Sequence, residues 1–320
     1  MNTAVIVILS GILPLLAVFL FLNRTVFWIG LPRNHRELHK ATTCEDLTLA
    51  CDGSSNAAVL MLHESGGTPE SMRYVGEALR KRGFDIYAPA MPGSALTDEE
   101  AASLDTPSQP GPWFSLARER LADLRARYRE VYLYGASYGG SIALALAQET
   151  QVEGIAVAAT PVTLYSRDFR KPLLRNAMLF FSPLLALTVR QVRTGMRSRE
   201  ARDMEGGEGA EGFLSPPAVH AQKVFLRKVR GGLARVRAPI LVLHARGDRT
   251  VDYRNAELIL SGVSSEVRRM LTVDLESDLL TRRHRLSTHI RARGAVSEAV
   301  AEFFSACHET ADGKPKAPAN

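Results

Sequence analysis

Short apolar runs recur along the chain and alternate with longer stretches in which apolar residues follow a helical period. A continuous apolar run between turn residues is typical of a strand that is buried on both faces, as in a parallel sheet. The predicted strands are residues 57–62, 84–88, 131–134, 155–158, 239–243 and 267–275.

Helices are predicted in the stretches between these runs. Strands that alternate with helices indicate βαβ crossovers, so we predict an α/β fold with a mostly parallel sheet and flanking helices. A weaker alternation at residues 45–51 predicts an antiparallel lead-in strand. The predicted helices are residues 69–82, 115–129, 138–148, 253–260 and 296–304.

The N-terminus has a different pattern, a nearly continuous apolar segment from Ala4 to Leu22. Its length suits a hydrocarbon core of about 30 Å. No Lys or Arg precedes it, whereas Arg24 and Lys40 follow it, the reverse of a secretory signal peptide. We therefore predict a retained transmembrane helix rather than a cleaved signal or a peripheral hairpin. The positive-inside rule then predicts localisation at the membrane, with the rest of the chain on the cytoplasmic side.

One long stretch, from Thr160 to Ala238, has no clear strand. Ordinary connections in α/β folds are two to six residues, so this length predicts a helical cap insertion. Residues 172–189 are strongly apolar and arginines flank them. These helices either pack over the sheet with solvated arginines, or form a cap that lines an apolar pocket or meets lipid headgroups. The predicted domains are a membrane anchor (1–30), a connector with the lead-in strand (31–56), the first part of the core (57–160), the cap (161–237), the second part of the core (238–308) and a disordered tail (309–320).

Composition narrows the possible partners. With 46% hydrophobic and 23% charged residues, the chain is globular rather than disordered. Its net charge of +6 comes without the interleaved aromatic and basic residues of a nucleic-acid module, so we expect a membrane partner and no nucleic acid. The three cysteines form no CxxC motif, and we expect no metal site and no other cofactor. The pattern does not indicate an oligomeric state.

The most informative motif is Gly135-Ala-Ser137-Tyr-Gly139, which follows a predicted strand and opens a predicted helix. A serine on a sharp strand-to-helix turn, with glycine two residues before and after it, forms a nucleophile elbow. Gly135 and Gly139 allow neighbouring backbones to approach the strained turn. Ser137 is therefore the candidate nucleophile.

Serine needs a base and an orienting acid, and in this layout the order along the chain is serine, acid, histidine. Asp248 follows the strand at 239–243, where catalytic groups of α/β sheets gather. Asp252 fits better as a cap for the helix that follows.

Two backbone N–H groups must hold the oxyanion. We predict that Tyr138, directly after the nucleophile, and Ser65, in the loop after the first buried strand, supply them. His63, in the same loop, is interpreted as a structural residue that shapes it.

The chain resembles the α/β-hydrolase superfamily, in particular the branch of bacterial carboxylesterases and monoacylglycerol lipases. The resemblance covers about residues 57–304 apart from the cap. It implies hydrolysis of acyl esters through an acyl-enzyme on Ser137, with Asp248 as the acid. The motifs that carry it are the elbow, His63-x-x-Gly-Gly67, Tyr87-Ala-Pro-x-x-Pro-Gly93 and Pro239-Ile-Leu-Val-Leu-His-Ala-x-x-Asp248.

Three positions depart from the family pattern. Glu64 stands where glycine usually follows the loop histidine, and Ser94 lies where the second turn usually has histidine. The segment after the last strand, residues 276–280, contains no histidine where the family base is usual. His284 or His289 is then the base, or the base is lost. A lone histidine flanked by arginines, as His284 is by Arg282, Arg283 and Arg285, is more often a solvated surface residue than a base.

The resulting hypothesis is a membrane-anchored serine esterase or lipase-like enzyme with Ser137, His284 and Asp248 as its catalytic residues. Two alternatives stay open: a non-catalytic or weakly active binding protein of this fold, and a serine hydrolase of thioesters or amides.

Overall fold

The centre of the molecule is a seven-stranded sheet with the strand order β1-β3-β2-β4-β5-β8-β9. The computed structural model describes residues 3–25, 44–94, 110–166, 172–189, 192–193, 213–214, 216–275 and 283–311. Paired strands run parallel except at one edge, where β1 is antiparallel to β3. The strands are β1 (Leu47–Leu49), β2 (Ala57–Leu62), β3 (Asp85–Ala88), β4 (Glu130–Ala136), β5 (Gly154–Ala158), β8 (Ile240–Ala245) and β9 (Arg268–Val273).

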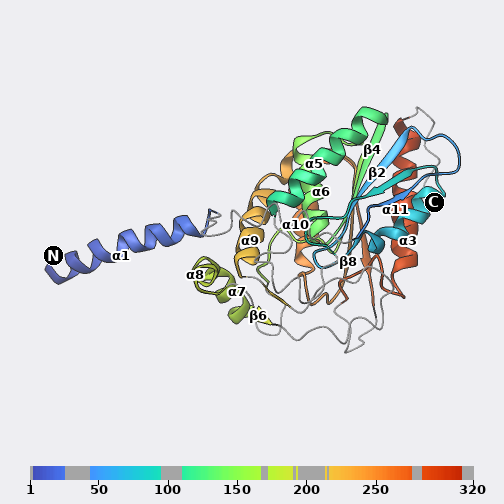
Figure 1. Ribbon diagram of the computed structural model, residues 1–320. Helices are drawn as coiled ribbons and strands as arrows, with labels where there is room; N and C mark the ends of the chain where they lie inside the picture. The colour runs from blue at the N-terminus through green and yellow to red at the C-terminus, as the bar shows by residue number, and fades with distance from the viewer. Residues whose placement is uncertain are drawn as a thin grey trace.

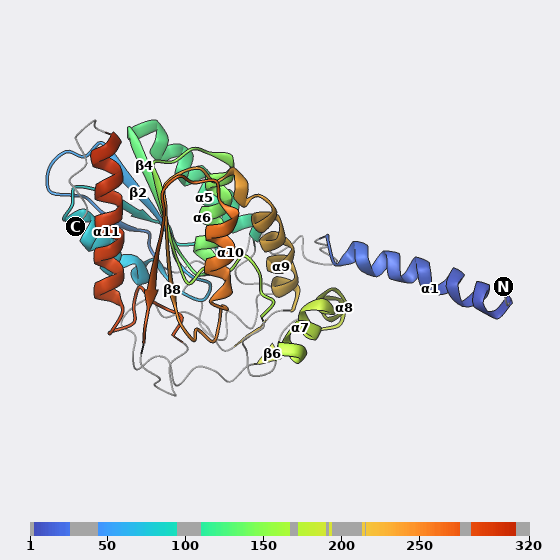
Figure 2. The ribbon, with the colours of Figure 1, turned by 180° about the vertical axis from the view of Figure 1, so that it is seen from behind.

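Helices cover both faces of this sheet (Figure 1, Figure 2). Two apolar cores result, one under each helical layer. The first layer contains α5 (Pro110–Arg127), α6 (Tyr138–Glu149), α9 (Pro216–Gly231) and α10 (Arg254–Gly262), and the second contains α3 (Arg73–Arg80), after the 3₁₀ turn η1 (Pro69–Met72), and α11 (Arg293–Ala311).

The strand β2 shows why its sequence is apolar at every position. Leu60 and Leu62 pack into the first core, whereas Val59 and Met61 pack into the second. Fully burying a side chain of this size contributes about 1.5–3 kcal/mol. Both faces of the strand therefore need apolar residues, and the predicted parallel α/β sheet is confirmed.

The ends of some helices differ from the prediction. Helix α5 begins at Pro110, five residues before the predicted start at 115. Pro110 and Pro112 lie in its first turn, where a helix does not use the backbone N–H groups that proline lacks. Helix α11 extends beyond the predicted 296–304 at both ends.

Among the described residues between β5 and β8, most are helical. This part of the chain contains α7 (Pro172–Phe180), α8 (Ser182–Thr188), the strand pair β6 (Val192–Arg193) and β7 (Phe213–Leu214), α9 and the short turn η3 (Leu233–Arg235). Phe225 of α9 packs its ring against the rings of Tyr138 and Phe114, so α9 belongs to the helical layer of the core. The domain boundaries stay predictions, and most of the predicted tail, from residue 312 on, lies outside the described residues.

The N-terminal apolar segment forms helix α1 (Thr3–Leu22), which projects away from the sheet (Figure 1, Figure 2). Within the described ranges, no helix has the combination of length and hydropathy that crossing a membrane requires. This finding contradicts the predicted single-pass anchor at 1–30 and the membrane localisation and orientation derived from it. Part of the apolar pattern instead serves packing within the protein, because the Phe19 ring lies 5.1 Å from that of Phe180.

The start of α6 lies directly against the end of β2. A Cβ atom on Gly139 would lie 2.1 Å from the Leu62 carbonyl oxygen. A Cβ atom on Gly135 would lie 2.5 Å from the Cα of Gly140. The two glycines that the sequence motif singles out are therefore sites of close backbone approach, and they fix the position of the turn between β4 and α6.

We expect Gly139→Ala to lower the free energy of unfolding by at least about 2 kcal/mol, because the added methyl group overlaps a backbone carbonyl. Urea denaturation followed by circular dichroism measures the change. Gly111→Ala in α5 is the matched control: nothing lies within 4 Å of its added Cβ, and alanine favours a helix by up to about 1 kcal/mol. Equal stability of the two variants would show that the fold does not need the close approach of α6 to β2.

Candidate active site

Ser137 lies at the junction of β4 and α6 with a φ of +50° and a ψ of −120°. Residues with a side chain rarely adopt this conformation, which costs on the order of 1–3 kcal/mol. The Ser137 N–H donates to the carbonyl oxygen of Ala158 at 2.7 Å, and its own carbonyl accepts from Gly140 N–H at 3.0 Å. These bonds hold the turn and present the hydroxyl at the carboxyl edge of the sheet, as the motif predicts.

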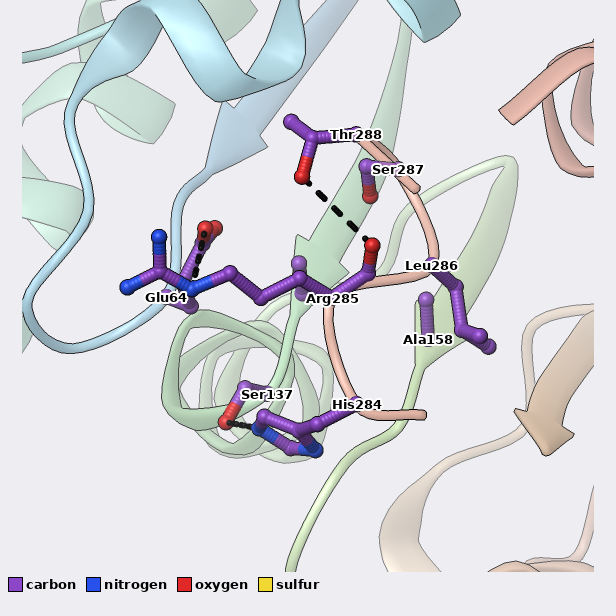
Figure 3. A pocket seen from close by; sticks show the side chains of 9 residues that line it. Glu64, Ser137, Ala158, His284, Arg285, Leu286, Ser287 and Thr288 are labelled. Atoms are coloured by element: carbon purple, nitrogen blue, oxygen red, sulfur yellow. Dashed lines mark hydrogen bonds and ion pairs between the residues drawn. The ribbon is translucent and has the colours of Figure 1, made fainter. Parts of the chain in front are cut away.

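His284 connects this hydroxyl to a carboxylate. Its Nε2 lies 2.8 Å from Ser137 Oγ (Figure 3), and its Nδ1 lies 2.8 Å from Asp248 Oδ2. An ionised carboxylate only accepts hydrogen bonds, so Nδ1 carries the ring proton and Nε2 accepts from the serine hydroxyl; these proton positions follow from the partners. Of the two candidate bases, the structure brings His284 to Ser137.

His289, the alternative base, is buried in the same segment. Its ring Nδ1 accepts from the backbone N–H of Arg291 at 3.2 Å. The backbone N–H of His289 donates to the carbonyl oxygen of Arg285 at 2.9 Å. These bonds hold a local turn ahead of α11.

Asp248 follows β8, where the sequence places it, and its side chain has no exposed surface. Its Oδ1 accepts from the backbone N–H groups of Thr250 at 2.7 Å and Val251 at 3.0 Å. Burial raises the pKa of this carboxyl, but the charge of His284 and hydrogen bonds from His244 and His284 outweigh it and lower the pKa to about 2. Asp248 is therefore ionised at every ordinary pH.

Asp252, the other acid considered, lies at the start of α10. Its Oδ1 accepts from the N–H of Arg254 at 2.9 Å, and its Oδ2 accepts from the Ser166 hydroxyl at 2.6 Å. It therefore accepts the first backbone N–H of α10, although the N-cap residue of this helix is Tyr253.

His244 is a contact of Asp248 that the sequence pattern did not reveal. Its Nε2 lies 3.4 Å from Asp248 Oδ2 and 3.2 Å from the carbonyl oxygen of Val251. Both are acceptors, so Nε2 carries the proton and donates to them. The only signal in the sequence is a histidine inside an otherwise apolar strand, and that signal does not specify its partner.

The two predicted oxyanion donors lie in different parts of the chain. The N–H of Tyr138 opens α6, where the first N–H groups have no acceptor within the helix. Ser65 is at the corner of a tight turn that Gly67 N–H closes on the Glu64 carbonyl at 3.0 Å, with Gly66 at a φ of +73°. Glu64 of this turn and Ser137 line one cavity.

His63 is completely buried beside this turn. Its Nε2 accepts from Met91 N–H at 3.2 Å, so its Nδ1 carries the proton and donates to the Glu64 carbonyl at 2.9 Å. The Ser94 hydroxyl also lies 3.0 Å from Nε2, and burial lowers the His63 pKa. These contacts link the loops after β2 and β3, and the structural role of His63 stays a prediction.

A small cavity of about 10 Å³ lies beside Ser137, with room for roughly one water molecule. Arg285 is one of its wall residues, and its side chain is only 6% exposed. It pairs with Glu64, and His284 beside it faces Ser137 rather than solvent. The cavity is lined by Glu64, Ala136, Ser137, Ala158, His284, Arg285, Leu286, Ser287 and Thr288.

No group of three or more His, Cys, Asp or Glu side chains in the described part of the chain could hold a metal ion.

Two curated proteins are similar to this chain over most of its length. A carboxylesterase of Bacillus subtilis (strain 168) is 22% identical over 233 residues, covering 70% of this chain and 88% of the relative. A thermostable monoacylglycerol lipase of Bacillus sp. (strain H-257) is 23% identical over 209 residues, 65% of this chain and 76% of the relative.

Among solved structures, a soluble variant of monoglyceride lipase from Saccharomyces cerevisiae superposes with a TM-score of 0.64 at 13% identity, covering 81% of this chain and 90% of that one. This similarity shows a shared fold. The family model "Alpha/beta hydrolase family" matches residues 59–284, more than half of the chain. The chain therefore belongs to the alpha/beta hydrolase family, and it resembles the carboxylesterase and monoacylglycerol lipase branch, as its motifs predict.

Proposed function

We propose that the protein is a serine hydrolase that cleaves carboxylic esters of small molecules through an acyl-enzyme on Ser137. One observation carries the proposal: hydrogen bonds of 2.8 Å each connect Ser137 Oγ to His284 and His284 to Asp248. The strained backbone of Ser137 supports it, because conformations of this kind are concentrated at functional sites.

In the first half of the reaction, Ser137 Oγ attacks the carbonyl carbon of the ester while its proton passes to His284 Nε2. The imidazolium that forms is stabilised by the ionised, buried Asp248. The tetrahedral intermediate then collapses, the bond to the leaving oxygen breaks, and His284 gives its proton to that oxygen. An alcohol departs and the acyl group stays on Ser137.

In the second half, a water molecule gives a proton to His284 Nε2 and attacks the acyl carbon. The bond to Ser137 Oγ breaks as His284 returns the proton to the serine, and a carboxylic acid leaves. In both halves the backbone N–H groups of Tyr138 and Ser65 stabilise the negative oxygen. Donors at such positions are each worth about 10²–10³-fold in rate.

The names of the relatives support the proposed substrate class. Two are named carboxylesterase and monoacylglycerol lipase, which favours an oxygen ester of an acyl group over a thioester or an amide. The same residues can act on all three bonds, so a panel of substrates decides among them: p-nitrophenyl esters and monoacylglycerols against the matching acyl thioester and aminoacyl anilide.

We expect Ser137→Ala to abolish both ester hydrolysis and labelling by a fluorophosphonate probe. His284→Ala should lower kcat on the order of 10⁴-fold or more, because the hydroxyl loses its base. His289→Ala is the matched control, and we expect it to keep activity within about tenfold of wild type. A spectrophotometric assay measures ester hydrolysis, and in-gel fluorescence measures labelling by the probe. Loss of labelling in His289→Ala alone would overturn the assignment of the base, and a wild-type Ser137 that stays unlabelled would favour a non-catalytic binding protein.

Asp248→Asn tests the acid through the pH dependence of stability. The folded-state pKa of about 2 lies below the usual 3.8, so the carboxylate stabilises the fold above about pH 4 and loses this effect as pH falls toward 2. Between pH 5 and pH 2, wild type should lose about 2 kcal/mol of unfolding free energy relative to Asp248→Asn. Urea denaturation at several pH values measures this difference, and parallel curves would count against a paired carboxylate. The variant should also lose about 10⁴-fold in kcat, because an amide stabilises the wrong imidazole tautomer.

A further inference from the structure

Glu64 and Arg285 form a buried ion pair beside the candidate nucleophile. Arg285 Nε lies 3.6 Å from Glu64 Oε1, and each side chain is only 6% exposed. Both line the cavity that also contains Ser137 and His284 (Figure 3). The pair joins two segments more than two hundred residues apart in the sequence: the turn after β2 and the segment that carries the candidate base.

The Glu64 carboxylate is held at a defined place. Its Oε2 accepts from the Ser71 hydroxyl at 3.0 Å. A Cβ atom on Gly67 would lie 2.8 Å from Glu64 Cδ, so the carboxylate occupies the space that a side chain at position 67 would need. Glu64 therefore folds back over its own turn and faces Arg285.

Arg285 contacts the backbone of the same turn as well. Its Nη2 donates to the Gly66 carbonyl at 3.2 Å. Its own carbonyl accepts from His289 N–H at 2.9 Å, which closes the local turn of the segment. A further bond, 2.7 Å between the Ser287 and Tyr134 hydroxyls, ties this segment to β4. The orientation of His284, the neighbour of Arg285, thus depends on contacts of the residues that follow it.

The opposite charges of Glu64 and Arg285 also affect the electrostatics of the reaction site. An unpaired carboxylate here would disfavour the negative oxygen that develops during ester cleavage, and it would stabilise the protonated form of His284. An unpaired guanidinium would have the opposite effect on His284. Together the two charges largely cancel at the short distances that matter in a buried site.

We propose that Glu64 and Arg285 are positioning residues that hold the His284 segment against the oxyanion turn and keep the reaction site electrically balanced. This inference rests on the proposed function. It relates two departures from the family pattern to each other: the acid at position 64, where glycine is usual, and a base supplied by a later segment. The carboxylate in the turn is the partner that docks the late segment.

The pH dependence of the His284 charge is the sharpest test. Removing one charge of the pair should shift the His284 pKa in a direction set by the charge that remains, whereas a contact that is only structural predicts no such direction. In Arg285→Met the remaining carboxylate favours the imidazolium, so the acid limb of kcat/KM should move to higher pH by roughly half a unit. In Glu64→Gln the remaining guanidinium should move it to lower pH by a similar amount. The other polar and charged groups around His284 and its acid stay unchanged in both variants: Ser137, Asp248, His244, Arg175 and Arg283.

The catalytic rates of the variants should also depend on whether a buried charge is left unpaired. Arg285→Met should lower kcat/KM about 10²-fold, the loss expected when a catalytic group is misplaced by about 1 Å. The double variant Glu64→Gln/Arg285→Met should recover at least about tenfold of this loss, since it buries no unpaired charge. Arg285→Lys should keep the acid limb of wild type while lowering kcat, because the charge remains but the two-point contact does not.

The exposed pair Glu70–Arg73, in the turn η1 and the start of α3, is the matched control. Its side chains are 47% and 42% exposed, and exposed pairs contribute little. We expect Glu70→Gln and Arg73→Met to leave the rate and the acid limb unchanged. Thermal unfolding of every variant identifies any that fail to fold, and Arg285→Lys then replaces Arg285→Met in the rate comparison.

The experiment combines pH–rate profiles with an NMR titration of the His284 ring, which reads its pKa without a substrate. Shifts of opposite sign in Glu64→Gln and Arg285→Met, cancelled in the double variant, support the inference. Shifts of the same sign, no shift in either variant, or a double variant as slow as Arg285→Met overturn it. A wild-type enzyme that neither hydrolyses esters nor reacts with the fluorophosphonate instead refutes the proposed function, whatever the titration shows.

Discussion

The strained backbone of Ser137 is the constraint on which the rest of the site depends. A residue with a side chain holds a positive φ only where its surroundings fix it, and here β5 accepts its N–H while glycines on both sides bring α6 against the end of β2. The strand that precedes the turn lies in the middle of the sheet. The Ser137 hydroxyl is therefore attached to the end of the central strand of the sheet.

The other groups reach this hydroxyl from distant parts of the chain. Asp248 comes from the end of β8, His284 from the segment after β9, and the turn 64–67 from the end of β2. All of these strands run in the same direction, so their carboxyl ends share one edge of the sheet. The parallel topology brings together residues that no local sequence pattern connects.

The buried carboxylates Asp248 and Glu64, at the carboxyl edge of the sheet, each face positively charged or hydrogen-bond-donating partners. Asp248 faces two imidazoles and two backbone N–H groups, and Glu64 faces a guanidinium and a hydroxyl. Leaving one partner of a buried charge pair unmatched is costly, so each acid and its partners constrain each other. This mutual constraint also orients His284, whose neighbour Arg285 is part of one pair and whose own ring is part of the other.

The sequence by itself determined the parallel α/β sheet and the sharp turn at Ser137, and it pointed to Asp248 as the candidate acid, because continuous apolar runs, flanking glycines and a position after a strand are local signals. It misjudged the N-terminal segment as a membrane anchor, because an apolar run does not show what surrounds it; here the Phe19 ring packs against Phe180. It left His284 and His289 as alternatives and did not indicate that Arg285 pairs with Glu64. Only the tertiary structure shows which imidazole reaches Ser137 and which acid Arg285 meets, because the direction of an imidazole or a guanidinium in an irregular segment depends on partners such as Asp248 and Glu64, which come from other strands.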